Sequence, residues 1–310
     1  MSRTGRGAVS DRHYLAQIMI SGQELWDDVD AALVVGTRFS APGLAWGRQD
    51  DVKLVRIDID PEQAGKPRAA DATLIAQAAT GLDALASRIP EHNRERASRQ
   101  NELRAAKQRA LDKLADLQPQ YGFAQVIREA LPDDGILVTD VTQMASFLQN
   151  WMPVYAPRTL ITPGYQATLG MGVPTALGAK VACPDRKVIC VSGDGGFMFN
   201  STAIHTAAAY DVPVVYLVLD NGGWRDVATV TGAMGSSLGE PGAEDAMRWT
   251  FRPPIDHASY ARSLGLKSWR ASNPEELESA FAAAFAEDGP TLIQVASAMG
   301  DVRVFGQAFA

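Results

Sequence analysis

Residues 187–221 read KVICVSGDGGFMFNSTAIHTAAAYDVPVVYLVLDN, a stretch that predicts a strand, a helix and a second strand. The two outer runs are short, apolar and rich in Val, which is typical of strands that are buried on both faces of a parallel sheet. The run from Asn200 to Tyr210 has the composition of a helix. A helix between two parallel strands is the repeating unit of doubly wound α/β domains.

The same alternation continues on both sides of this stretch. Upstream it includes a helix at 123–131 (FAQVIREAL), a strand at 135–140 (GILVTD) and a helix at 173–182 (VPTALGAKVA). Downstream, a helix, a strand, a helix and a last strand end in TLIQVAS at 291–297. We therefore predict a doubly wound parallel-sheet domain over residues 121–310.

A smaller α/β unit precedes this domain. Residues 31–36 (AALVVG) and 53–59 (KLVRIDI) have the composition of buried parallel strands, whereas residues 1–30 show no strand pattern. We predict a partial Rossmann-like middle domain over residues 1–90, whose sheet has an unfinished edge. Residues 91–120, in which leucines stand among many charges, are predicted to form a solvated helical connector.

Composition excludes several classes of partner. The chain has 310 residues, 46% of them hydrophobic, and a net charge of -7 with both signs interspersed. It therefore offers neither a basic stripe for nucleic acid nor a polybasic segment for a membrane. No run approaches the roughly 20 apolar residues of a membrane helix, and no signal-peptide pattern is present. Cys183 and Cys190 lack metal-ligand spacing, so we expect packing thiols in a cytoplasmic protein.

The most specific pattern lies at the ends of two neighbouring predicted strands. One strand ends at Asp194 and Gly195, and the next ends at Asp220 and Asn221. Ligands of doubly wound sheets bind beyond the carboxyl ends of the strands, so these side chains should face one crevice. A carboxylate, an amide oxygen and a backbone carbonyl suit Mg²⁺, and the glycine-rich helix start suits phosphate. Each turn alone could be structural, but together they favour a magnesium and diphosphate site.

This pattern resembles the signature of the thiamine diphosphate enzymes of the acetolactate synthase, benzoylformate decarboxylase and pyruvate decarboxylase type, in which GDG is followed farther along by NN. Residues 34–39 (VVGTRF) and 56–66 (RIDIDPEQAGK) are similar to the later part of that family's middle domain, and residues 121–310 to its diphosphate-binding domain. The resemblance implies a decarboxylase or carboligase that depends on thiamine diphosphate and Mg²⁺ and acts on a 2-oxo acid or aldehyde.

The resemblance also assigns roles residue by residue. The metal ligands match Asp194, Asn221 and the carbonyl of Gly223, and residues 141–144 match the segment that holds the other side of the diphosphate, although Gln143 could equally be an ordinary exposed residue. Leu169 matches the apolar side chain that bends the cofactor. No catalytic residue is assigned on this chain, and the predicted cofactor contacts are Thr142, Gln143, Met144, Ala167, Leu169, Asp194, Gly195, Gly196, Asn221 and Gly223.

Several positions depart from the family's pattern. Asp220 stands where the family prefers Asn, and its carboxyl either tightens the metal as an anion or is neutral with a raised pKa. Ala203 replaces the usual acidic residue, which is similar to benzoylformate decarboxylase. We expect His205 to be a core or interface residue rather than an acid–base group, and Trp224 either to line the substrate pocket or simply to pack.

Two segments are candidates for substrate contacts. Residues 225–256 form a polar, glycine-rich stretch that is too long for an ordinary connection, which predicts a lid or a partner-docking loop. The tail from Phe305 to Phe309 is the other candidate. Neither segment identifies the substrate.

The resemblance implies a part that this sequence does not contain. In the family, a Glu on an N-terminal pyrimidine-binding domain hydrogen-bonds the cofactor and activates it, and the site lies between two domain types. We find no Glu in such a context here. We therefore expect a pyrimidine-binding-domain polypeptide or a homo-oligomer to complete the site, and the isolated chain to be inactive. FAD is possible but not favoured, because flavin-free relatives share the framework of residues 36–39 and 58–61.

Two other functions stay open. The chain could be a non-catalytic truncated remnant that binds cofactor weakly or binds only a partner. A nucleotide-binding Rossmann protein using residues 193–196 is the weaker alternative, since the spaced third glycine of the G-x-G-x-x-G pattern is missing. Oligomeric state is not fixed by the sequence.

Overall fold

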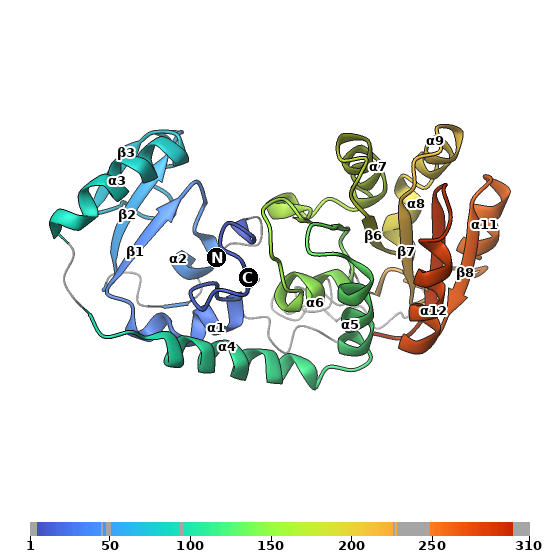
Figure 1. The fold of residues 1–310 in the computed structure, drawn as a ribbon, viewed down its shortest axis with the longest axis horizontal. Helices are drawn as coiled ribbons and strands as arrows, with labels where there is room; N and C mark the ends of the chain where they lie inside the picture. Colours follow the sequence, from blue (N-terminus) through green and yellow to red (C-terminus); the bar gives the residue numbers. More distant parts are fainter. Residues whose placement is uncertain are drawn as a thin grey trace. The chain divides into compact units, whose positions relative to one another are not determined.

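The computed structural model describes residues 5–44, 46–47, 51–92, 96–225, 227 and 249–299. Within them the chain forms two compact units. One is built from the described residues between Tyr14 and Leu111, and the other from residues 5–13 together with those from Asp112 onward. Figure 1 shows the fold and labels most of the helices and strands.

The smaller unit contains a three-stranded parallel sheet in the order β1-β2-β3. Its strands are β1 (Ala31–Val35), β2 (Lys53–Asp58) and β3 (Ala72–Ile75), so the two predicted strands are confirmed. We did not predict β3, because all four of its residues are exposed and give no buried apolar run. Of the described residues before Ala31, none forms a strand; they contain α1 (Met19–Glu24) and the short helix η2 (Trp26–Asp28).

Three further helices follow the strands of this unit: α2 (Ser40–Leu44), α3 (Ala78–His92) and α4 (Gln100–Ala115). The predicted helical connector is therefore helical, but it is not solvated on all sides. Ala106, Ala110 and Leu114 are fully buried, and their spacing of four residues forms one apolar stripe along α4. The many charges of this segment had hidden that stripe in the sequence.

The larger unit contains a six-stranded, all-parallel sheet in the order β5-β4-β6-β7-β9-β8. The predicted doubly wound parallel fold is confirmed. We did not predict β5, because a strand of two residues leaves no pattern. The strands are β4 (Ile136–Thr139), β5 (Leu160–Ile161), β6 (Val188–Gly193), β7 (Val215–Asp220), β8 (Lys267–Ala271) and β9 (Thr291–Ala296).

Helices cover both faces of this sheet. Alternate strand residues such as Val138, Cys190 and Val218 pack in one core with side chains of α7, α9 and α11, and α5, α6 and α12 contact one another or the sheet on the other side. Because both faces are covered, a ligand can reach the central strands only at their ends. The helices are α5 (Gln120–Ala130), α6 (Gln143–Trp151), η3 (Gly164–Gln166), α7 (Gly172–Ala182), α8 (Asp194–Phe199), α9 (Ala203–Ala209), α11 (His257–Ser263) and α12 (Pro274–Ala284).

One boundary in the deciding stretch differs from the prediction. We expected the strand to run through the glycines and the helix to begin at Asn200, but β6 ends at Gly193 and Asp194 is already the first residue of α8. The helical run then breaks at Asn200 and resumes as α9. Asp194 therefore lies in the first turn of a helix.

None of the helices in the described part of the chain is long and apolar enough to cross a bilayer.

Two helix glycines of this unit should respond in opposite ways to alanine. Gly178 of α7 is exposed and has open space around it, so Gly178→Ala should stabilise the protein by about 0.5–1 kcal/mol through helix propensity. At Gly122 of α5 the added carbon would lie 2.9 Å from Cγ of Pro274, and overpacking of this kind typically costs about 1–3 kcal/mol. Urea unfolding of both variants tests this, and equal stabilisation would contradict the packing of α5 on α12.

Candidate functional site

The carboxylate of Asp194 joins the ends of β6 and β7. Its Oδ1 accepts a hydrogen bond from the N–H of Gly195 at 2.8 Å, and its Oδ2 accepts one from the N–H of Gly223 at 2.7 Å. The first contact lies in the opening turn of α8 and the second in the loop that follows β7. We call residues 221–223 the metal loop, because they contain two of the three residues predicted as metal ligands. The sequence-predicted residues at the ends of these two strands are thus brought together.

Asn221 presents a free oxygen in this loop. Its Nδ2 donates to Oε1 of Gln143 at 3.2 Å, whereas its Oδ1 is buried and accepts no hydrogen bond. A buried acceptor without a partner is costly and calls for an explanation. A divalent cation would supply the missing partner, since amide and carboxylate oxygens are ligands that Mg²⁺ accepts. The carbonyl of Gly223 accepts from the N–H of Arg225 at 2.9 Å and keeps a second lone pair.

The donor set fits a hard cation with oxygen ligands. Within the described ranges no group of three His, Cys, Asp or Glu side chains could hold a metal ion. A metal at this place would therefore take one carboxylate, one amide oxygen and one backbone carbonyl from the protein, with the remaining ligands coming from phosphate or water. Burial raises the pKa of Asp194 to about 6, and the neighbouring Asp220 carboxyl acts in the same direction, against the two N–H groups. A cation would favour the ionised form.

Asp220, the departure from the family's pattern, accepts a hydrogen bond at each of its carboxyl oxygens. Its Oδ1 accepts from the N–H of Gly222 at 3.0 Å, and its Oδ2 accepts from Nε2 of Gln294 at 2.6 Å. Both oxygens are thus engaged by N–H donors of the protein. The carboxyl of Asp220 thus contacts the backbone of the metal loop at Gly222.

The start of α8 is closely packed at both of its glycines. A side chain at position 195 would begin 2.5 Å from a ring carbon of Trp224, and one at 196 would begin 3.1 Å from Oδ1 of Asp140. First-turn N–H groups have no partner within their helix and suit an anion. Trp224 packs edge-on against Phe199 and Phe251, each with 5.5 Å between ring centroids. The structure thus shows that Trp224 packs, and its partial exposure is compatible with both alternatives.

The segment after β4 borders the same site. Gln143, whose oxygen accepts from Asn221, is only 8% exposed, so it is not the ordinary exposed residue that we weighed as an alternative. Thr142 lies beneath Gly193, where an added side chain would begin 3.2 Å from its Cβ. Met144 is fully buried in the core, which leaves only its backbone to face a ligand.

Residues 164–172 form a tight loop that is held by an acid we did not predict. Oδ1 of Asp140 accepts from the N–H groups of Val141 at 2.7 Å and Gly170 at 3.0 Å, and its Oδ2 accepts from Gly172 at 2.8 Å. Asn200 holds the loop from the other side by donating to the carbonyl of Gly170 at 2.8 Å. Burial raises the pKa of Asp140, and the three N–H groups oppose that shift.

The two predicted contacts in this loop lie on its outer part. Ala167 has a left-handed backbone with φ of 48°, and it is exposed, while Leu169 is partly exposed rather than a core residue. This loop therefore presents Leu169 next to Gly170, the residue that Asp140 and Asn200 fix. The signal for Asp140 was visible in the sequence, because a charged residue closes the apolar strand GILVTD.

Other predicted positions lie away from these contacts or outside the described residues. His205 is exposed on α9, which excludes the core alternative, and Ala203 is partly buried at the start of the same helix. Of the predicted 225–256 loop, residues 226 and 228–248 lie outside the described residues, as does the Phe305–Phe309 tail. The end of the loop returns to the site, where the backbone N–H of Trp224 donates a hydrogen bond to the carbonyl of Trp249 at 2.8 Å.

Asp140→Asn should destabilise the larger unit. An amide in this place turns one acceptor into a donor that faces buried N–H groups, and an unsatisfied buried group of this kind costs about 1–3 kcal/mol. Urea unfolding measures the loss. Asp185→Asn, at an exposed position, is the matched control and should leave stability nearly unchanged; a loss no greater than in that control would contradict the role of Asp140.

Two family descriptions match the sequence. Residues 140–295 match "Thiamine pyrophosphate enzyme, C-terminal TPP binding domain", and residues 2–85 match "Thiamine pyrophosphate enzyme, central domain". Thiamine pyrophosphate and thiamine diphosphate are the same cofactor. The first match contains β6, β7 and the whole site described above.

Individual proteins give the same result. The chain is 30% identical to a probable acetolactate synthase large subunit of Methanococcus aeolicus over 94% of this chain and 52% of that protein. It is 31% identical to a benzoylformate decarboxylase of Pseudomonas aeruginosa over 87% of this chain and 49% of that protein. A solved Rhodococcus jostii RHA1 thiamine diphosphate-dependent 4-hydroxybenzoylformate decarboxylase is similar, with a TM-score of 0.68, 26% identity, and coverage of 88% of this chain and 49% of that one. The chain thus spans about half the length of these relatives.

Proposed function

The chain belongs to the thiamine pyrophosphate enzymes, and on that premise we propose that it holds the diphosphate of the cofactor through Mg²⁺ for the decarboxylation or ligation of a 2-oxo acid or aldehyde. The observation that carries this proposal is the buried Oδ1 of Asn221, which has no hydrogen-bond partner beside the buried carboxylate of Asp194. Structural turns satisfy their own polar groups, whereas a cation site leaves ligand atoms free.

Each residue of the site has a distinct task in binding. Asp194, Asn221 and the carbonyl of Gly223 would hold the metal, and the backbone at Gly195 and Gly196 would face the diphosphate oxygens at the start of α8. Gly196 would contribute its N–H, because the N–H of Gly195 donates to Oδ1 of Asp194. Oε1 of Gln143 accepts a hydrogen bond from Nδ2 of Asn221. This contact orients the amide so that the oxygen of Asn221 would face the metal. Glycine at 195 and 196 lets an anion approach the backbone closely.

The loop over residues 167–170 would face the organic part of the cofactor. We propose that Leu169 supports its bent shape, with the N–H of Leu169 and the carbonyl of Ala167 as polar contacts. Asp140 and Asn200 make this surface rigid, because they bind the N–H and the carbonyl of Gly170. When bound, the cofactor supplies the nucleophilic carbon that attacks a substrate carbonyl and then stabilises the resulting negative charge.

We propose that the group which activates the cofactor comes from outside these 310 residues. Contacts to the diphosphate and to one side of the cofactor would come from Thr142, Gln143 and Met144, together with the metal loop, α8 and the 167–170 loop. None of these segments supplies an acid for the aminopyrimidine ring of the cofactor. A carboxylate for that task would come from a pyrimidine-binding domain, from another copy of the protein or from another polypeptide. The substrate class rests on the relatives, since benzoylformate and its 4-hydroxy derivative are 2-oxo acids. We do not propose FAD.

Calorimetric titration with thiamine diphosphate and Mg²⁺ tests the cofactor site. The chain should bind the pair, inorganic diphosphate with Mg²⁺ should compete, and thiamine alone should not bind. Asp194→Ala should weaken binding at least about tenfold, because even residues that only orient metal ligands contribute about 10–100-fold. The control is Asp211→Asn, which removes an exposed carboxylate before β7, at the end opposite to the site. Binding that Asp194→Ala leaves unchanged, or no binding by any of these proteins, would leave the non-catalytic alternative.

Proton exchange tests the origin of the activating group. Deuterium exchange at the thiazolium carbon of cofactor bound to the 310-residue chain should proceed as in free cofactor, because we place the activating carboxylate outside this sequence. Nuclear magnetic resonance after acid quench measures the rate, and a full-length acetolactate synthase treated identically should accelerate it. Acceleration by the chain alone would refute this part of the proposal.

A further inference from the structure

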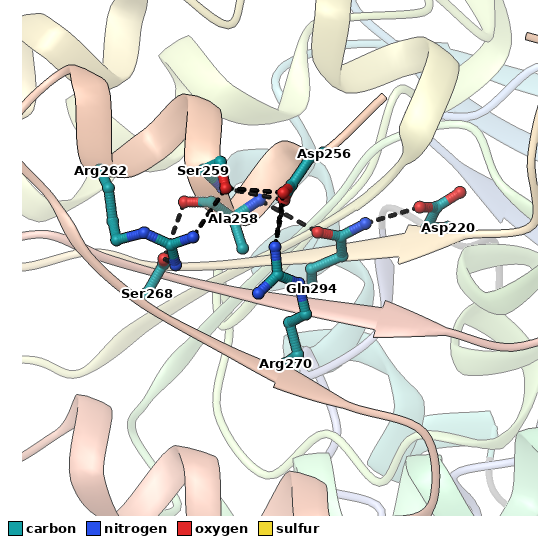
Figure 2. Close-up of polar contacts among 8 residues, drawn as sticks. All are labelled: Asp220, Asp256, Ala258, Ser259, Arg262, Ser268, Arg270 and Gln294. Atoms are coloured by element: carbon teal, nitrogen blue, oxygen red, sulfur yellow. Dashed lines mark hydrogen bonds and ion pairs between the residues drawn. The ribbon is translucent and has the colours of Figure 1, made fainter. Parts of the chain in front are cut away.

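Gln294 is a buried amide with a partner at each end. It lies on β9 beside Val218 of β7 and is 7% exposed. Its Nε2 donates to Oδ2 of Asp220 at 2.6 Å, and its Oε1 accepts from the N–H of Ala258 at 3.0 Å (Figure 2). The orientation of the amide is therefore determined, because only the oxygen can accept from Ala258 and only the nitrogen can donate to Asp220.

The start of α11 fixes the backbone that orients this amide. Asp256 caps the helix by accepting from the N–H of Ser259 at 3.0 Å and pairs with Arg270 of β8 at 2.6 Å. Ser268, also on β8, donates to the carbonyl of Ala258 at 2.8 Å. Figure 2 shows these contacts around Ala258 and, on the other side of Gln294, the contact to Asp220. Ala258 is thus fixed by side chains of both β8 and β9.

The contact continues from Asp220 into the metal loop. Oδ1 of Asp220 accepts from the N–H of Gly222 at 3.0 Å, and Gly222 has a left-handed backbone with φ of 81°. Gly222 stands between Asn221 and Gly223, the two residues of the loop to which we assign metal ligands. A shift of the Asp220 carboxyl would therefore move both ligand oxygens.

We propose that Gln294 is a positioning residue, which holds the Asp220 carboxylate so that the metal loop presents Oδ1 of Asn221 and the carbonyl of Gly223 to the cation. This inference rests on the proposed function. It assigns to Asp220 a role as a carrier of loop geometry rather than as a metal ligand, because its two hydrogen bonds join Gln294 to the backbone of Gly222.

The amide of Gln294 donates to the carboxylate of Asp220, so exchanging the amide and the carboxylate between these two positions tests the proposal. In Gln294→Glu, a carboxylate oxygen replaces the amide nitrogen and faces the carboxylate of Asp220. In Asp220→Asn, an amide nitrogen faces the amide nitrogen of Gln294. The double variant satisfies every contact again. Its carboxylate on β9 would accept from the N–H of Ala258 and from the new amide at the end of β7, and the oxygen of that amide would accept from the N–H of Gly222.

Binding of Mn²⁺ in the presence of thiamine diphosphate is the readout, followed by electron paramagnetic resonance on the folded 310-residue chain. Each single variant should bind Mn²⁺ about tenfold more weakly, in line with the size of a hydrogen bond to a charged group, and the double variant should return to within about threefold of the unchanged protein. Circular dichroism establishes that each variant is folded, and its thermal unfolding reports any loss of stability separately.

The outcomes separate the possible roles. If charge alone mattered, the added carboxylate of Gln294→Glu would tighten Mn²⁺ binding, which would overturn the proposal. Lower thermal stability with unchanged Mn²⁺ affinity in the single variants would also overturn it, because Gln294 would then be merely structural. So would a double variant as weak as the singles. Asp194→Ala serves as the reference, and Mn²⁺ binding by the unchanged chain that does not depend on Asp194 would refute the proposed function itself.

Discussion

The structure of the site depends on one buried carboxylate that links two strands. Asp194 accepts N–H groups from Gly195 in α8 and from Gly223 in the metal loop. It therefore sets the distance between the segment suited to an anion and the segment suited to a cation. A carboxylate buried without a positive partner is costly, and the raised pKa of Asp194 reflects that cost. A metal ion at this position would offset that cost. The buried carboxylate that destabilises the folded protein is therefore also suited to bind a cation.

The carboxylate of Asp194 accepts from backbone N–H groups, and polar side chains hold the neighbouring segments in place. Asp140 and Asn200 fix Gly170 from opposite sides, and Gln294 fixes Asp220. Each of these polar side chains reaches a partner across elements that are distant in the sequence. Buried polar networks of this kind specify one arrangement only when every member has its partner. In the metal loop, Oδ1 of Asn221 has no hydrogen-bond partner, and it lies where we place the cation.

The chain corresponds to only part of its relatives, and this limits the function that we propose for it. It matches the central and the C-terminal domains of the thiamine pyrophosphate enzymes and covers about half of the relatives' length. We propose that the site described above provides the diphosphate side of a cofactor pocket. We assign the chemistry that activates the cofactor to residues beyond these 310, and so the chain is proposed as the binding half of an enzyme.

Much of this protein was determined by local sequence. The buried strands β6 and β7 follow from apolar runs that end in Gly and Asp, and the pairing of Asp194 with the Asn221 loop follows from the rule that ligands bind beyond parallel strand ends. Tertiary structure alone decided which atoms are free. Asn200 and Gln294 carry no motif, and Asp140 is marked only as the acid that closes an apolar strand. The partners of all three that matter here are 30 or more positions away. Likewise, the exposed strand β3 and the buried stripe of α4 depend on neighbours that a local pattern cannot show.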